Sequence, residues 1–295
     1  MERLSRADLA IIGAIPPKGI PLGRLAEAIG LSPSHVSERV RSLRELGLVR
    51  TQKCGLSVLV AHSDSPSMAA LSALIAEGSG LDLEKVLTGP GLAMLPHLLA
   101  PGRTSSDIMK RTGLSQATVR ERLRVWRGMG IAVRESRTCL YRLAPARRAL
   151  ADFAARYSEV RNMRILGRKV PGAVIVWQDR DEFLFSVGSG TGVAGFVLAG
   201  PGALAALGYD VAHSRDYWLG GRPGRKIKEE EALVQTMLIE PGNPRAVQWI
   251  RECVKGRGLD PALILDIAGK YGLGREIGKI LGDALGAKEV RAKRD

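Results

Sequence analysis

The spacing of apolar side chains near the start of the chain alternates between helical and strand-like periods. It predicts, in order, helices over residues 8–15, 21–29 and 33–46 and a β-hairpin over residues 48–60 with a turn near 53–55. The boundaries carry matching signals, since Pro16 stops the first helix, Ser32 is a preferred N-cap and Pro33 suits a first helical position. Gly47 can end the third helix because glycine adopts left-handed backbone without strain.

The same pattern occurs a second time. Shifting the chain by 83 residues against itself aligns Gly30-Leu31-Ser32 with Gly113-Leu114-Ser115 and gives twelve identical positions over residues 6–50. Apolar positions also match in kind, as Leu25 does with Ile108. A repeated supersecondary unit makes the interpretation of each copy stronger. The second copy predicts its own hairpin over residues 131–143.

Helix, helix, tight turn, helix and hairpin is the element order of a winged helix-turn-helix domain. Over the stretches from Leu25 to Ser32 and from Leu46 to Val49, the chain resembles the DNA-binding domains of MarR- and ArsR-type prokaryotic regulators. The resemblance implies that the third helix of a copy lies in the major groove of DNA and that the protein regulates transcription.

The predicted fold is mainly α with small β: two winged helix-turn-helix modules, then a small α/β domain and a helical tail. The expected boundaries are winged helix 1 over 1–64, a connector over 65–88, winged helix 2 over 89–144, a linker helix over 145–168, the α/β domain over 169–224 and the helical C-terminal region over 225–295. The connector is expected to hold a helix over 67–77 and a glycine-rich loop over 78–80, and to fix the two modules relative to each other.

A step of 100° per residue divides the third helix of each copy into an apolar and an outer face. The residues expected to be buried are Val36, Val40, Leu43, Val119, Leu123 and Trp126. A recognition helix needs short hydroxyl groups near its N-terminus and arginines further along, which bind guanine edges or phosphates. From the outer faces and the hairpins, the candidate DNA-contacting residues are Ser34, His35, Ser37, Arg41, Arg44, Lys53, Thr118, Arg120, Arg124, Arg127, Arg134 and Arg137.

Positive charge gathers in one quarter of the chain. The whole sequence has a formal net charge of +14, and residues 89–164 alone carry fifteen basic and five acidic residues. A basic surface attracts polyanions, so this clustering favours duplex DNA as the partner. The second copy is expected to contribute more DNA contact than the first, in which Glu38 and Glu45 dilute the outer face. Winged helices also serve as protein-interaction modules, and that alternative stays open for each copy.

The second half of the chain mixes strand-like and helical stretches. The pattern predicts strands over 173–177, 183–187 and 196–199, a short helix over 203–207 and further helices over 229–239, 244–254, 261–271 and 275–285. Residues 190–195 spell GxGxxG, a pattern that dinucleotide-binding loops also have. Those loops lead into a helix, whereas Phe196 opens a strand-like run, so a glycine-rich hairpin without a bound nucleotide is expected.

Candidate chemistry in the sequence is sparse. Asp179 and Asp181 flank Arg180 in a stretch typical of a solvated turn, and the four histidines lack the spacing of metal ligands. Cys54 and Cys139 fall in corresponding hairpins and are interpreted as small apolar strand residues, with a thiol sensor as the alternative. The protein is therefore expected to be no enzyme and to use no cofactor.

Residues 200–208 are similar to a segment after the winged helix in AbiEi-type antitoxin and repressor proteins, and no function is transferred from so short a stretch. The leading hypothesis is a transcriptional regulator that binds double-stranded DNA in a sequence-specific or semi-specific manner. A homodimer and a small-molecule or protein effector at the C-terminal half are the further partners expected. The alternatives are a replication or chromosome-architecture protein and a nucleic-acid-modifying enzyme with a C-terminal nucleotide-binding domain.

The uncharged run over residues 186–209 has the length of a membrane span, but its glycines and Pro201 indicate strand, turn and helix. The three cysteines lie far apart, and the first residues lack the apolar core of a signal peptide. A cytoplasmic, nucleoid-associated protein without membrane contact is expected.

Overall fold

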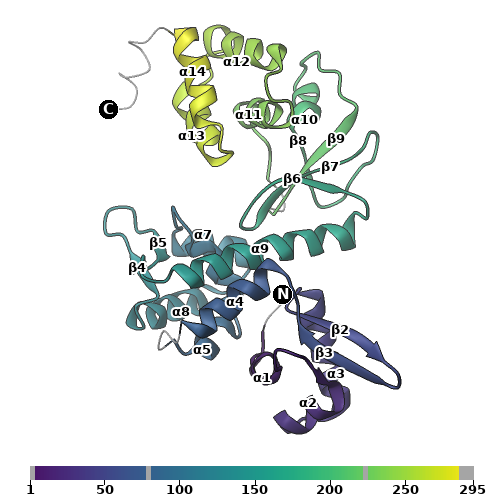
Figure 1. Cartoon of the computed structure of the whole chain (residues 1–295). Coiled ribbons are helices and arrows are strands. Elements are labelled where there is room, and N and C mark those ends of the chain that lie inside the picture. Colours follow the sequence, from purple (N-terminus) through teal and green to yellow (C-terminus); the bar gives the residue numbers. More distant parts are fainter. Residues whose placement is uncertain (1–3, 78–80, 222–224, 286–295) are drawn as a thin grey trace. The chain divides into compact units, whose positions relative to one another are not determined.

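The computed structural model describes residues 4–77, 81–221 and 225–285 (Figure 1). Two compact units divide the chain, one over residues 1–168 and the other over residues 169–295. The first unit holds both copies of the repeat, and the second unit holds the strands and helices of the C-terminal half.

The first segment, α1 to β3, has the three helices and the hairpin in the predicted order, together with a short strand, β1, that the apolar pattern does not predict. Its elements are α1 (Arg6–Ala14), β1 (Ile20–Pro21), α2 (Leu22–Ile29), α3 (Pro33–Glu45), β2 (Val49–Cys54) and β3 (Ser57–His62) (Figure 1). The three strands form an antiparallel sheet in the order β1-β3-β2. α1 begins earlier than predicted because the side chain of Ser5 accepts from the backbone N–H of Asp8, whose carboxylate accepts in return from the backbone N–H of Ser5.

The connection between the two copies is helical. It contains α4 (Pro66–Ala76), α5 (Leu83–Leu87), α6 (Gly91–Met94) and the 3-10 helix η1 (Leu95–Leu98). α4 corresponds to the helix expected over 67–77, and the loop expected over 78–80 lies outside the described residues. The turn from α5 into α6 is tightly packed, since a Cβ on Gly91 would lie 1.9 Å from the backbone oxygen of Val86.

The second segment, α7 to β5, repeats the order of α2 to β3. α7 (Ser105–Thr112) and α8 (Gln116–Gly128) precede an antiparallel hairpin of β4 (Ala132–Arg134) and β5 (Tyr141–Leu143). Gly113 ends α7 in the left-handed conformation, as Gly30 ends α2. A serine N-cap then opens the next helix in both segments. The local signals that the repeat shares therefore produce the same turn twice.

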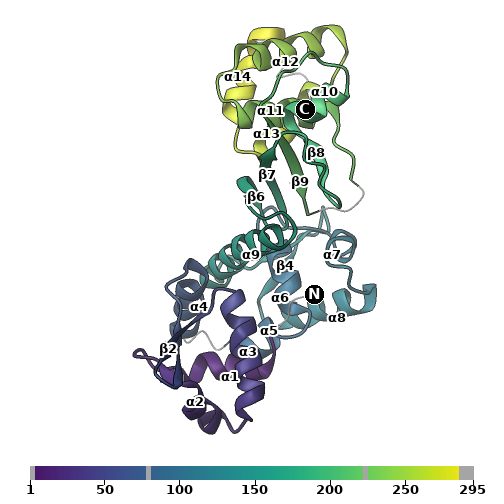
Figure 2. The ribbon, with the colours of Figure 1, turned by 90° about the vertical axis from the view of Figure 1, so that its right-hand side faces the viewer.

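The helix predicted as a linker does more than separate two domains. α9 (Arg148–Lys169) buries Leu150, Phe153, Ala154 and Tyr157 in the hydrophobic core that also contains residues of both segments. These four positions follow the i, i+3, i+4, i+7 spacing of one helix face. α9 lies beside α4 in both views of the ribbon (Figures 1 and 2). The two segments, the connection and α9 thus form one packed body.

The second unit contains a four-stranded antiparallel sheet in the order β6-β7-β9-β8. Its strands are β6 (Val174–Asp179), β7 (Glu182–Gly188), β8 (Val197–Ala199) and β9 (Arg215–Gly220). The sequence predicts that the strands on either side of the glycine loop pair with each other as a hairpin. This prediction is wrong, because β9 lies between β7 and β8. The residues after the loop do form the strand expected there rather than a helix. β9 is not predicted by the sequence pattern.

Helices complete the second unit, and they are α10 (Gly200–Ala206), α11 (Glu229–Ile239), α12 (Pro244–Gly256), α13 (Pro261–Lys270) and α14 (Gly274–Leu285). α11 packs through Leu238 and Ile239 against the sheet, and its buried residues join α12, α13 and α14 in a second core. Within the described residues, no helix has the length and apolar character that crossing a membrane requires.

Candidate nucleic-acid interface

α3 and α8 each turn one face into the core of the first unit. The inner faces are buried as predicted, at Val36, Val40, Leu43, Val119, Leu123 and Trp126. Both helices begin at a capping serine: the backbone N–H of His35 donates to Ser32 Oγ at 3.4 Å, and that of Thr118 donates to Ser115 Oγ at 3.2 Å. The buried face and the cap together determine which side chains point outward.

The candidates on the first segment all lie on exposed positions, and they are Ser34, His35, Ser37, Arg41, Arg44 and Lys53. Arg44 is directed toward the hairpin, because its Nη1 donates to Thr51 Oγ1 of β2 at 3.3 Å. Arg41 makes no ion pair with any residue that the structure describes. Its guanidinium is thus available to an external phosphate or base edge.

The candidates on α8 differ in whether their side chains already bond to other residues of the protein. Arg120, Arg124 and Arg127 are exposed, whereas Thr118 is half-buried and its Oγ1 lies 2.8 Å from Ser115 Oγ. Arg124 pairs with Glu121 through two hydrogen bonds of 2.7 and 2.9 Å. This bonding lowers the pKa of Glu121 and raises the pKa of Arg124, so both groups are charged at neutral pH. Part of the charge of Arg124 is therefore already compensated, and Arg120 and Arg127 are the freer cations.

The second hairpin carries its two candidates near its tip. Arg134 ends β4, and its Nη2 donates to the sulfur of Cys139 at 3.1 Å. Arg137 is exposed in the loop between β4 and β5. Cys139 lies in the same loop with a φ of 55°, and Cys54 is exposed at the end of β2. The interpretation of these cysteines as apolar strand residues is therefore wrong, because neither side chain is packed.

Two of the arginines that the repeat shares have structural partners. Arg39 Nε donates to Asp8 Oδ1 at 2.8 Å and its Nη2 also bonds this buried carboxylate, which raises the pKa of Arg39. Arg122, the equivalent residue of α8, donates to the backbone oxygen of Lys85. Arg39 thus fastens α3 to α1, and Arg122 fastens α8 to α5. Identity between the copies at these positions reflects packing, and neither residue is among the candidates for DNA contact.

Glu45 does not dilute the outer face of α3 in the way that the sequence suggests. Its Oε2 accepts from Arg164 Nη2 at 2.7 Å and from Arg168 Nη2 at 2.6 Å, and both arginines belong to α9. Two cations therefore neutralise one carboxylate beside the C-terminal end of α3. Sequence reasoning missed this contact because the partners lie far apart in the chain.

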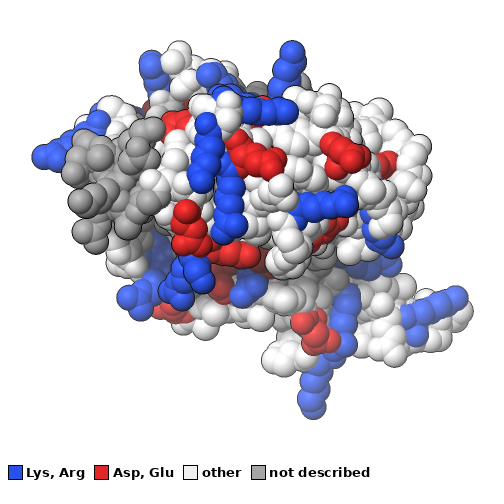
Figure 3. Space-filling view, turned by 90° about the horizontal axis from the view of Figure 1, so that it is seen from above, with Lys and Arg blue, Asp and Glu red and all other residues white. Residues whose placement is uncertain are grey.

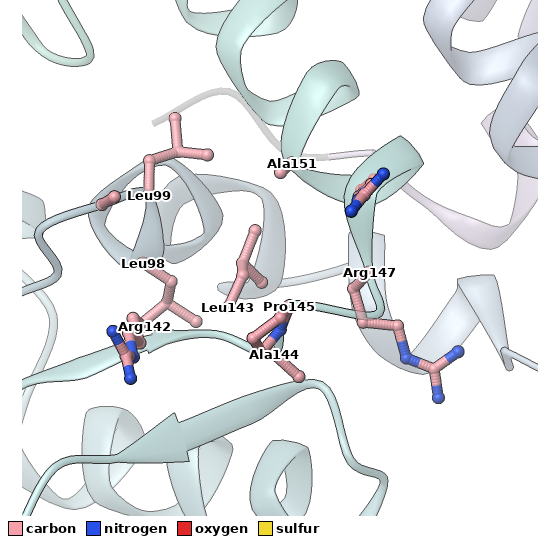
Figure 4. A pocket seen from close by; sticks show the side chains of 10 residues that line it. Leu98, Leu99, Arg142, Leu143, Ala144, Pro145, Arg147 and Ala151 are labelled. Atoms are coloured by element: carbon pink, nitrogen blue, oxygen red, sulfur yellow. The ribbon is translucent and has the colours of Figure 1, made fainter.

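A small apolar pocket lies at the base of the second hairpin, with a volume of about 170 Å³ (Figure 4). It is lined by residues at the end of η1, at the end of β5, in the connection to α9 and at the start of α9, namely Leu98, Leu99, Leu143, Pro145 and Ala151. The side chains of Arg142 and Arg147 lie around it. The pocket belongs to the first unit, whereas the effector was expected at the C-terminal half.

The glycine loop of the second unit is closed by a side chain of its own sheet. The backbone N–H of Gly190 donates to Asp216 Oδ2 at 2.7 Å, and the other oxygen of Asp216 lies 3.2 Å from His213 Nε2. Across the described residues, no group of three or more His, Cys, Asp or Glu side chains is arranged to hold a metal ion. On the face drawn in Figure 3, basic and acidic side chains are interspersed rather than separated.

Comparison with known families identifies the first segment. Residues 18–50, which run from the turn after α1 to the first strand of the hairpin, match the family model of a winged helix-turn-helix DNA-binding domain. No curated protein matches the chain. The N-terminal part of this protein is a winged helix-turn-helix DNA-binding domain, and α3 is the helix that follows its turn.

Proposed function

We propose that this protein is a transcriptional regulator that binds duplex DNA through two winged helix modules, over residues 1–64 and 89–144. The observation that carries the proposal is the second segment, which repeats the element order of the matched domain and exposes arginines at equivalent positions of α8. A recognition helix with exposed arginines suits guanine edges and phosphates in the major groove.

Charge supports the same proposal. The segment over 89–164 has ten more basic than acidic residues, fifteen against five, and its exposed acidic Glu121 is paired with Arg124. A surface of this kind displaces condensed cations from DNA phosphates, which favours association at low salt. The second module is thus proposed to supply most of the electrostatic attraction.

The second unit is proposed to serve sensing or assembly, through a homodimer contact or a small-molecule or protein effector, without enzymatic activity. The protein is proposed to act in the cytoplasm on the nucleoid. Genome-wide recovery of bound DNA would distinguish this role from replication or chromosome architecture, since promoters, origins and diffuse coverage are three different outcomes.

The direct test is DNA affinity measured against potassium chloride concentration on one fixed duplex. We expect the logarithm of the binding constant to fall steeply and linearly with the logarithm of the salt concentration, because several phosphates are neutralised. The double variant Arg120→Ala with Arg124→Ala should weaken binding more than Ser37→Ala with Arg41→Ala, and it should also reduce the slope.

A flat salt profile in the wild-type protein would overturn the proposal that the protein binds DNA. Equal losses in the two double variants would mean that both modules dock alike. A loss confined to the variant of α3 would assign DNA binding to the first module and leave α8 as a protein-interaction surface. Circular dichroism of each variant checks that the fold is kept.

A further inference from the structure

The tip of the first hairpin carries a leucine that nothing in the protein covers. Leu56 has a relative exposure of 109%, the highest among the large apolar side chains that are exposed in the described residues. The root of the same hairpin is anchored in the core by Val49 and Val60, which are both buried. In Figure 1 the strands β2 and β3 project from the first segment toward this tip. Leu56 therefore lies at the tip of a hairpin whose base is packed in the core.

The turn itself does not require an apolar residue. Cys54 pairs with Ser57, so Gly55 and Leu56 form a two-residue loop, in which Gly55 takes the positive φ of 59°. Leu56 has no positive φ, and position 56 accepts polar side chains in turns of this kind. The conformational demand thus falls on Gly55 alone. A fully solvated leucine contributes nothing to the folded state, since its apolar surface stays in water.

The second hairpin, at the equivalent place, is polar. The tip of its loop contains Glu135, Ser136, Arg137 and Thr138, all exposed, and the aliphatic Leu140 of the same loop is half-buried beside β5. Both hairpins follow the third helix of their segment, yet only the first ends in an aliphatic side chain. This difference indicates that the first tip has a contact of its own and that general hairpin stability does not explain it.

We propose that Leu56 is a wedge that enters the minor groove of bound DNA and inserts between two base pairs. Aliphatic side chains on minor-groove-binding proteins unstack and kink base steps in this way. The proposal rests on DNA binding by the first module, which the family match supports. Lys53 and Val58 are cross-strand partners and share one face just below the tip, so a cation lies where the phosphates that flank the groove would pass.

Charge complementarity makes DNA the occupant rather than a second copy of this chain. Lys53 is the exposed cation nearest the leucine along the hairpin, whereas Arg50 lies at the root of β2 and pairs with Asp64 at 3.1 Å. A tip with an apolar end and a cation beside it suits a groove whose walls are anionic phosphates and whose floor is a stack of base pairs, between which an apolar side chain can insert. A second copy of this chain would bring another Lys53 to the tip rather than an anionic group.

The test uses the full-length protein and a duplex with a central TA step, which is easily unstacked, that carries 2-aminopurine beside the step. The wild-type protein should raise the 2-aminopurine fluorescence on binding. Leu56→Ser should abolish this rise and weaken binding by about tenfold, with the salt slope unchanged, because no charge is removed. Leu56→Phe should restore both the fluorescence and the affinity. Leu207→Ser is the matched control, since Leu207 is another exposed leucine in the second unit.

Each outcome decides a different point. If the wild-type protein binds the duplex and Leu56→Ser binds it equally tightly with the same fluorescence, the wedge is excluded and the DNA-binding proposal stands. If the wild-type protein does not bind DNA, the proposed function is excluded, and the wedge, which rests on it, is excluded with it. If Leu56→Ser instead changes the mass measured by sedimentation of the free protein, the leucine is a contact between copies of this chain and the wedge is again excluded.

Discussion

The ion pair between Arg39 and Asp8 shows how one helix uses some arginines for structure and leaves others for recognition. Asp8 is fully buried, caps the start of α1 and accepts two hydrogen bonds from Arg39 of α3. Arg41 lies two positions further along α3 and is exposed. A step of 200° around the helix separates the two guanidinium groups, so that one fastens α3 to α1 and the other stays free for an external partner.

Arg39→Ala should destabilise the first unit by about 3 kcal/mol, because it leaves the carboxylate of Asp8 buried without its cation. Chemical denaturation measures the free energy of unfolding. Arg41→Ala is the matched control, and its effect on stability should stay within about 0.5 kcal/mol. DNA affinity should rank the two variants the other way: it should fall for Arg41→Ala, the variant whose stability is nearly unchanged. Equal stability of the two variants would mean that the Asp8 pair contributes little.

α9 is the element that joins the copies of the repeat. Its first half buries Leu150, Phe153, Ala154 and Tyr157 in the shared core, and its second half supplies the two arginines that bind Glu45 at the end of α3. The close approach extends to the backbone, since a Cβ on Gly47 would lie 3.4 Å from Val160. α9 therefore holds the two segments of the first unit together.

Phe153→Ala should destabilise both segments together, by about 3 kcal/mol or more, because the cavity opens in a core that they share. Hydrogen exchange should become faster in α3 as well as in α8. Met163→Ala, at an exposed position of the same helix, serves as the control and should leave exchange unchanged. Faster exchange in α8 alone would show that the two segments fold independently.

The elements that the sequence predicts well are those with local boundary signals. Ser32, Pro33 and Gly30 specify the start of α3 and the turn before it through contacts within a few residues. β9 escapes prediction because what makes it a strand is pairing with β7, from Phe183 to Gly220, across a long stretch of chain. The buried face of α9 did have a signal, the spacing of Leu150, Phe153, Ala154 and Tyr157, but the many arginines and alanines around it suggest a solvated spacer. The outer faces of α3 and α8 follow from periodicity, whereas the pairing of Glu45 with α9 requires the tertiary fold.

At the scale of the whole molecule, the second unit contains a buried network of charged side chains. Its buried charges compensate one another, since Glu182 and Glu231 both pair with Arg225 and Lys270. Tyr271 donates a further hydrogen bond to Glu231 at 2.7 Å, and burial raises the pKa of Tyr271. Such a network is expected to hold β7, α11 and α13 together rather than to bind a ligand.

The glycine loop of this unit should bind neither S-adenosylmethionine, NAD nor ATP. The loop leads into β8 and not into a helix, and the N–H of Gly190 is already bonded to Asp216, so the convergent amides that hold a pyrophosphate are missing. Isothermal titration calorimetry should show no saturable heat with any of the three. Micromolar binding that Gly192→Val abolishes would contradict this expectation, and Gly192 is the cleaner position because its φ is not positive.

Because the two segments share a core, the first unit holds α3 and α8 at a fixed separation and a fixed relative orientation. If both segments dock, neither can swing away on a flexible tether, so the protein cannot search a range of separations as linked domains do. B-DNA completes a turn in about 10 base pairs, and an insertion of half a turn would carry the second target to the opposite side of the duplex. A rigid pair of modules would then discriminate between operators by rotational phase, even where every base that the two helices contact is the same.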